Sequence, residues 1–122
     1  MIMDNKLPKS ERLNSTNDIS KLFKSKNHVS YEEFTILFDH QKGINQSVKI
    51  LISVPKKNHS RAVTRNKIKR LIREAYRRNK HIISKFHGYL YLGICYNSQE
   101  ILHFSEIEAK IKVILQRLND KI

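Results

Sequence analysis

The chain alternates between two hydrophobic periodicities, one typical of helices and one typical of strands. Ser15 or Thr16 can cap a short first helix that ends near Asn27. Its apolar positions recur at helical spacing, at Ile19, Leu22 and Phe23. Residues 31–38 and 47–54 instead alternate apolar and polar positions, as half-buried strands do. Turn-forming residues separate these two segments, so we expect them to pair as an antiparallel hairpin.

The alternation also assigns a face to each residue of the expected strands. The positions expected to point inward are Phe34, Ile36, Phe38, Val48, Ile50, Ile52 and Val54. The opposite face carries Thr35, Leu37, Lys49, Leu51 and Ser53. Glu32 and Glu33 fall inside the first strand and should therefore face opposite sides.

The second half of the chain predicts two further helices around one apolar strand. A helix is expected over residues 62–80, and residues 89–96 form an apolar run that suits a strand covered on both sides. Ser105 and Glu108 can form a capping box for a last amphipathic helix, whose apolar positions are Ile107, Ile111, Ile114, Leu115 and Leu118. Residues 1–14 show no periodicity and are expected to form an extended arm.

The element order is therefore α-β-β-α-β-α, with room for one further short strand. With 122 residues the chain is the size of a single domain, so residues 1–122 should form one α+β sandwich around one core. No segment has the length and apolar character of a membrane span or a signal-peptide core, which predicts a cytoplasmic protein without a membrane partner.

Charge points to the class of partner. Lys and Arg number 24 against 11 acidic residues, which gives a formal net charge of +13. Nine of the twenty residues from Arg61 to Lys80 are Lys or Arg, and Glu74 is the only acid among them. A solvated helix face usually intersperses acids, so this helix is expected to pack with its apolar side and to bind a polyanion with the other. Asn66 projects within about 40° of Arg70, Arg73 and Arg77, where an amide can bond a base, a ribose or a phosphate.

The segment RAVTRNKIKRLIREAYR resembles the signature of the bacterial ribonuclease P protein subunit. The family's pattern is Arg-Asn-Arg, a hydrophobic residue, Lys-Arg, two hydrophobic residues and Arg-Glu, and residues 65–74 match it with Lys67 in place of the second arginine. That substitution keeps the charge but loses the bidentate fork. Pro55 to Lys57 resembles the Ser-Lys-Lys that precedes the helix in the family, and Arg12, Leu13 and Phe23 add weaker similarity.

The resemblance implies a ribonucleoprotein that removes the 5′ leader of precursor tRNA. The long helix would dock on the catalytic RNA, within an unusual left-handed β-α-β crossover. The residues expected to bind RNA are Lys56, Lys57, Arg61, Arg65, Asn66, Lys67, Lys69, Arg70, Arg73 and Arg77. Cleavage would be performed by Mg²⁺ held in the RNA, so the protein would contribute no catalytic residue and no metal site, and would require no protein partner.

The resemblance also implies a cleft for the single-stranded leader, formed by the first helix and the open face of the sheet. Its expected residues are Ile19, Phe23, Leu37 and Ser53. Ile19 and Leu37 stand where relatives commonly carry Phe and Tyr, which leaves Phe23 either as the stacking aromatic or as an ordinary core residue. Tyr89 and Tyr91 could also contact RNA, but their apolar strand favours the core.

The sequence offers no constellation for protein-based catalysis. It lacks a Gly-rich phosphate loop, GxSxG, CxxC and HExxH spacing, and clustered acids for a two-metal nuclease. The six histidines are scattered; His59 lies in the basic loop, where it could reach a phosphate. The alternative is a noncatalytic RNA-binding structural protein such as a small ribosomal protein, which would share the charge but need no leader cleft.

Overall fold

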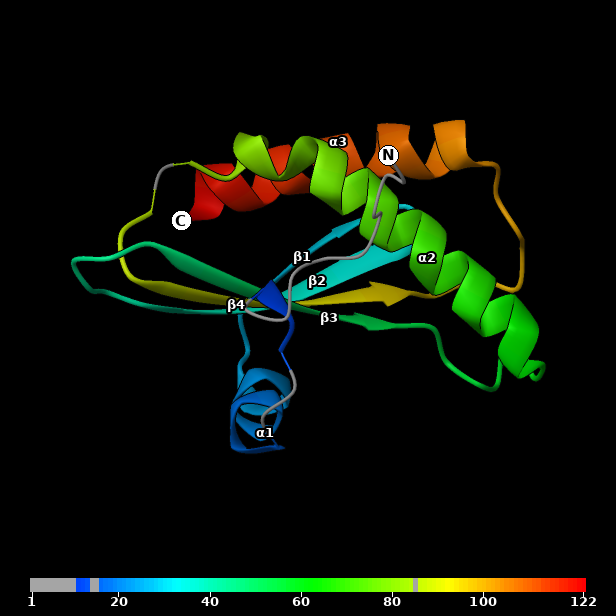
Figure 1. Cartoon of the computed structure of the whole chain (residues 1–122), viewed down its shortest axis with the longest axis horizontal. Coiled ribbons are helices and arrows are strands. Elements are labelled where there is room, and N and C mark those ends of the chain that lie inside the picture. Colours follow the sequence, from blue (N-terminus) through cyan, green and yellow to red (C-terminus); the bar gives the residue numbers. More distant parts are fainter. Residues whose placement is uncertain (1–10, 14–15, 85) are drawn as a thin grey trace, which may run out of the picture.

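The chain folds as a four-stranded sheet between helices, in the order α-β-β-β-α-β-α. The computed structural model describes residues 11–13, 16–84 and 86–122. The elements are α1 (Thr16–Lys24), β1 (His28–Tyr31), β2 (Phe34–Gln41), β3 (Ser47–Ser53), α2 (Ala62–Asn79), the 3₁₀ helix η2 (Lys80–Ile82), β4 (Tyr89–Tyr96) and α3 (Phe104–Lys121). Figure 1 shows α2 and α3 on one face of the sheet and α1 on the other.

The order of strands across the sheet is β1-β2-β4-β3, so the predicted hairpin between residues 31–38 and 47–54 is wrong. β4 lies between β2 and β3; it pairs antiparallel with β2 and parallel with β3. The reason is that β4 is apolar, and a strand at the centre of the sheet can be covered on both faces. β2 and β3 are amphipathic and can flank it. α2 thus connects two parallel neighbours, and the hand of this crossover remains a prediction.

The predicted strand 31–38 is two strands joined by a tight turn. Glu32 has a φ of +50°, and Glu32 and Glu33 form the turn from which β2 pairs back antiparallel on β1. The two acids therefore lie in a turn and not on opposite faces of one strand. β1 is the further short strand for which the sequence left room.

The core lies between the sheet and the two long helices. Six of the seven predicted inward strand residues are buried there, and Val48 packs partly buried against them. All five apolar positions predicted for the last helix are buried as well. α3 begins earlier than expected, and its capping box is formed by His103 and Glu106 instead of Ser105 and Glu108. Glu108 instead accepts a hydrogen bond from Asn79 of α2, so it ties the two helices together.

The described end of the predicted arm lies along β3. Arg12 bridges Ile50 in the parallel sense, and the amide of the buried Leu13 donates to the Ile50 carbonyl at 2.8 Å. The rest of the arm, residues 1–10 and 14, and the capping candidate Ser15 lie outside the described residues. No helix in the described part of the chain is both long and apolar enough to cross a membrane.

Candidate RNA-binding surfaces

α2 turns most of its apolar residues toward the core, which leaves one side of its first half exposed. Ile68, Ile72, Ala75 and Tyr76 are buried against the sheet and α3. A strip at spacings of three and four residues faces solvent, and consists of Val63, Asn66, Lys67 and Arg70. The predicted helix 62–80 is thus confirmed to within one residue, since Lys80 begins η2.

Most of the predicted RNA-binding cations have no ion-pair partner among the described residues. The exposed ones are Lys56, Lys57, Arg61, Lys67 and Arg70, while Lys69 and Arg73 are half-buried. The ion pairs of the described chain involve other cations, namely Arg77, Arg78, Lys80 and Lys110. Uncompensated charge on one helix face produces a positive potential that an anionic ligand would neutralise.

Arg77 differs from the other cations of α2, because it already holds a carboxylate. Its Nη2 and Nε donate to Glu74 at 2.7 and 3.1 Å in a bidentate pair. The hydrogen bond from Arg77 lowers the pKa of Glu74, and the same contact raises the pKa of Arg77. Arg77 therefore lies on the predicted face but is already paired with Glu74 of the same helix.

Arg65 and His59 organise the loop before α2. Arg65 Nη1 donates to the His59 and Ser60 carbonyls, both at 2.9 Å, which ties the loop to the first turn of the helix. His59 does not reach outward to a phosphate as its position suggested. Its ring is buried, stacks on Tyr96 with centroids 6.2 Å apart, and donates from Nε2 to the Ser98 carbonyl at 2.7 Å. No periodic pattern along the chain predicts this tertiary contact.

Arg73 of α2 lies close enough to Arg12 of the arm for the two charges to interact. Burial lowers the pKa of the Arg73 guanidinium, and the nearby charge of Arg12 lowers it further. The two guanidinium groups therefore repel each other at the side of α2 that faces the β3 edge. The RNA-binding role expected of Arg73 stays a prediction.

A second surface lies on the opposite face of the sheet, where α1 covers only part of the strands. The registers place Leu37, Gly93 and Leu51 side by side in one row, and Thr35, Cys95 and Ser53 in the next. α1 contacts β2 and β4 and, within the described chain, does not reach β3. Among the described elements, no helix covers the β3 side of this face (Figure 1).

Leu22 anchors α1 on the sheet. It is fully buried, and a Cβ added at Gly93 would lie only 3.0 Å from its Cδ2, so the helix can approach this closely only over a glycine. Ser25 Oγ adds a hydrogen bond to the Phe38 carbonyl at 2.9 Å. Sequence reasoning recognised Leu22 as apolar but expected Ile19 and Phe23 to cover the sheet.

The predicted cleft residues take different environments around this anchor. Ile19, Leu37 and Ser53 are half-buried, whereas Phe23 is 53% exposed on α1. The alternative that Phe23 is an ordinary core residue is therefore wrong. Leu37 on β2 and Ser53 on β3 share the open face but are separated by β4, so α1 overhangs only the first.

Tyr89 and Tyr91 add aromatic groups to the same face, where the sequence favoured the core. Tyr89 is 49% exposed and Tyr91 is half-buried. Burial raises the pKa of Tyr91, followed by the charge of Asp18, which places the start of α1 beside this ring. Their parity with Gly93 along β4 is the signal that could have found them. Among the described residues, no three His, Cys, Asp or Glu side chains lie close enough to hold a metal ion.

Comparison with known proteins agrees with this arrangement. A family model described as Ribonuclease P matches residues 7–119. The ribonuclease P protein component of Porphyromonas gingivalis is 34% identical over 120 residues, covering 92% of this chain and 85% of that protein. The corresponding protein of Geotalea uraniireducens is 31% identical over 112 residues, covering 92% and 94%. The solved ribonuclease P protein from Thermotoga maritima superposes with a TM-score of 0.71 at 28% identity, covering 88% of this chain and 96% of that one. The chain belongs to the ribonuclease P protein family.

Proposed function

We propose that this chain is the protein subunit of a bacterial-type ribonuclease P, which removes the 5′ leader from precursor tRNA. The observation that carries the proposal is the exposed strip of α2, where Asn66, Lys67 and Arg70 face solvent and the two cations have no acidic partner among the described residues. Such a strip suits the phosphate backbone of a structured RNA, and the exposed amide adds a group that can bond a base or a ribose.

The leader would enter the open face beside α1. This face offers apolar contact at Leu37 and an exposed ring at Phe23, and aromatic side chains stack on bases without regard to sequence. Lys56 is exposed shortly after the end of β3 and would supply charge for the leader backbone. Cleavage itself is assigned to Mg²⁺ ions bound in the RNA subunit, and the protein would raise the affinity for substrate and metal.

A reconstitution assay tests this function. The full-length protein, a bacterial ribonuclease P RNA and the two combined are each incubated with precursor tRNA over a range of Mg²⁺ and salt concentrations. We expect no cleavage by protein alone, and cleavage at the mature 5′ end at lower Mg²⁺ when protein and RNA are combined.

Two outcomes would contradict the proposal. Cleavage by the RNA-free protein would place catalysis in the chain itself. Tight binding to the RNA without any change in its Mg²⁺ or salt requirement would favour the noncatalytic RNA-binding alternative.

A further inference from the structure

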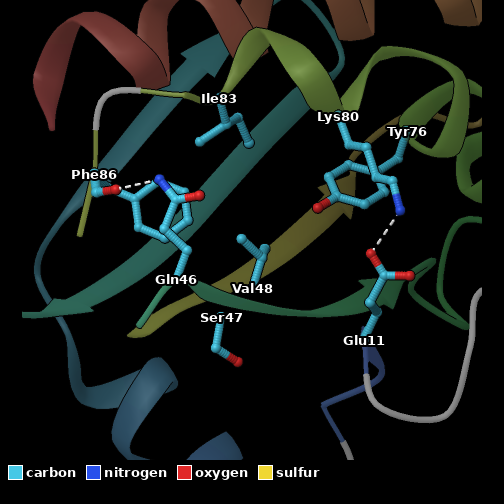
Figure 2. A pocket seen from close by; sticks show the side chains of 8 residues that line it. All are labelled: Glu11, Gln46, Ser47, Val48, Tyr76, Lys80, Ile83 and Phe86. Atoms are coloured by element: carbon cyan, nitrogen blue, oxygen red, sulfur yellow. Dashed lines mark hydrogen bonds and ion pairs between the residues drawn. The ribbon is translucent and has the colours of Figure 1, made fainter. Parts of the chain in front are cut away.

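A cavity at the C-terminal end of α2 is lined by charges that balance each other. Its volume is about 350 Å³. Figure 2 shows Lys80 Nζ paired with Glu11 at 2.7 Å, and Gln46 Nε2 donating to the Phe86 carbonyl at 2.6 Å. Glu11 and Lys80 are the charged side chains among those that line it. The lining of this cavity therefore gives no reason to expect an ionic ligand.

A second cavity, at the edge of the sheet, is lined by cations. This edge cavity lies between β1 and the last turns of α3, and its volume is about 390 Å³. Its lining residues are His28, Val29, Ser30, Arg117, Asp120 and Lys121. Arg117 and Lys121 are exposed, and in the part of the chain that the structure describes neither forms an ion pair, although Asp120 also lines the cavity. Two cations against one acid leave the lining with a net positive charge.

Both cations are held along the outer edge of β1. Arg117 Nη1 donates to the Ser30 carbonyl at 3.0 Å, and Lys121 Nζ donates to the His28 carbonyl at 3.2 Å. The Arg117 guanidinium also lies over the Tyr31 ring, 4.8 Å from its centroid. β1 is an edge strand, so the amides of His28 and Ser30 point outward together with these carbonyls. Guanidinium, ammonium and backbone amide groups are the donors that proteins use to bind phosphate.

A row of small side chains joins the edge cavity to the open face of the sheet. The registers align four residues across β1, β2, β4 and β3, namely Ser30, Thr35, Cys95 and Ser53. Leu22 of α1 contacts the sheet at Gly93, which belongs to the neighbouring row. Because its four side chains are small, this row gives a strand of RNA a shallow path from β3 to the edge of β1.

Positive charge accompanies both ends of this row. Lys56 is exposed three residues after Ser53. At the other end, residues 19–31 lead from α1 into β1 and include three lysines and no acid. All three are exposed, at Lys21, Lys24 and Lys26. A cationic path of this kind suits the phosphate backbone of a single-stranded nucleic acid.

We propose that the edge cavity binds phosphates of the 5′ leader of precursor tRNA, after the leader has crossed the sheet along this row. Arg117 and Lys121 would contact the phosphates, and the outward amides of His28 and Ser30 would donate further hydrogen bonds. The inference rests on the proposed function, because the leader is the strand assigned to this face. It gives α3 a part in substrate binding that only long leaders can use.

Precursor tRNAs with leaders of different lengths test the site. Leaders of about 4, 8 and 16 nucleotides span the site sizes of small domains that bind single strands. The affinity of the reconstituted enzyme is measured for each precursor and for mature tRNA. Arg117→Gln should weaken binding of the precursor with the longest leader about fivefold, the upper end for one exposed ion pair. Binding of the precursor with the shortest leader and of mature tRNA should not change.

Two further variants make this test specific. Lys121→Gln should have the same effect as Arg117→Gln, and it leaves intact the contact between Arg117 and Tyr31. Lys112→Gln is the matched control, because Lys112 is exposed on the same helix but does not line the edge cavity. It should bind every precursor as the unaltered chain does.

The proposal holds if the longest leader increases the affinity of the unaltered enzyme and if Arg117→Gln and Lys121→Gln reduce this gain. It is overturned if leader length has no effect, or if both variants keep the full gain. It is also overturned if they weaken binding of mature tRNA equally, which would assign the edge cavity to another part of the RNA. Cleavage is measured in the same samples. Cleavage at the mature 5′ end without any gain from a longer leader removes only this inference, whereas absence of cleavage for every precursor removes the proposed function and this inference with it.

Discussion

Arg70 and Arg77 carry the same group on the same helix, but only Arg70 is available to a new partner. Arg70 is exposed, while Arg77 already donates twice to Glu74. We expect Arg70→Ala to weaken binding to ribonuclease P RNA by about 1.5–3 kcal/mol, the range for a charged hydrogen bond. Arg77→Ala should cost less, because RNA would first have to displace Glu74. Filter binding at fixed salt measures both, and equal losses would show that the internal pair opens on binding.

The ring of Phe23 is exposed enough to contact a bound RNA base. Because it is 53% exposed, Phe23→Ala should leave the stability of the fold almost unchanged. Loss of one stacked base should lower the affinity of the reconstituted enzyme for precursor tRNA by about 1–3 kcal/mol and leave mature tRNA, which has no leader, unaffected. The affinity ratio of the two RNAs is the measurement. Leu22→Ala serves as the contrasting variant, since removing this buried anchor should cost about 2–5 kcal/mol of folding stability.

Individual side chains were predictable where their role follows from position in a helix or strand. The outward positions of Asn66 and Arg70 on α2 were predicted correctly, because a helix projects its residues at fixed angles, whereas Arg73 and Arg77 of the same predicted face are half-buried. The internal roles of Arg65 and His59 could not be predicted from the sequence. Both side chains bond to backbone carbonyls, and no residue pattern encodes the direction of a carbonyl.

At the scale of elements, Gly93 sets the distance between α1 and the sheet. A Cβ at this position would press on Leu22, so Gly93→Ala should loosen α1 slightly and Gly93→Val more strongly, at about 1–3 kcal/mol. Hydrogen exchange of the α1 amides follows the change directly. If α1 keeps its protection in a folded Gly93→Val protein, the helix does not depend on this close approach.

The turn between β1 and β2 is held to α3 by an ion pair between Glu33 and Lys110. The hydrogen bond from Lys110 lowers the pKa of Glu33 below its ordinary value of 4.5. A lowered pKa in the folded state means that the pair stabilises the fold above pH 4.5 and that this contribution is lost as the pH falls through the lowered value. The pKa of Lys110 is raised by the same contact, so the contribution is constant around neutral pH.

Lys110→Ala should therefore reduce the difference in unfolding free energy between neutral and acidic pH. Urea unfolding at several pH values measures this difference. Glu33→Gln should flatten the profile to the same extent, because it removes the same pair. The pair between Glu74 and Arg77 remains in both variants and preserves part of the acid sensitivity. A Lys110→Ala profile parallel to that of the unaltered chain would contradict the assignment.

The elements themselves were largely predictable, but the neighbours of each strand were not. Alternation gave the correct inward face of β2 and β3, since a strand has only two faces. It could not show that β4 lies between them, because pairing depends on residues distant in sequence. The break at Glu32 was also hidden, since only its positive φ distinguishes it from a strand residue.

For the whole molecule, the net charge of +13 predicts steep salt dependence of RNA binding. Each contacted phosphate of a single strand contributes about −0.7 to the slope of log K against log salt concentration. Lys69 is half-buried on α2 and has no acidic partner in the described chain. It is predicted to contact one phosphate, so Lys69→Ala should reduce the slope by about 0.7. Lys110→Ala is the control, because Lys110 pairs internally on α3. An unchanged slope in Lys69→Ala would show that Lys69 contacts no phosphate.

The strand at the centre of the sheet is also the last strand to be synthesised. β1, β2 and β3 leave the ribosome before β4, and within the described chain β3 pairs with β4 and otherwise only with the arm at Arg12. The sheet can close only after Tyr96 has emerged, by which time all of α2 is already outside. Pairings between residues distant in sequence form slowly. We therefore expect α2, the most cationic segment of the chain, to be synthesised before the sheet against which it packs has formed.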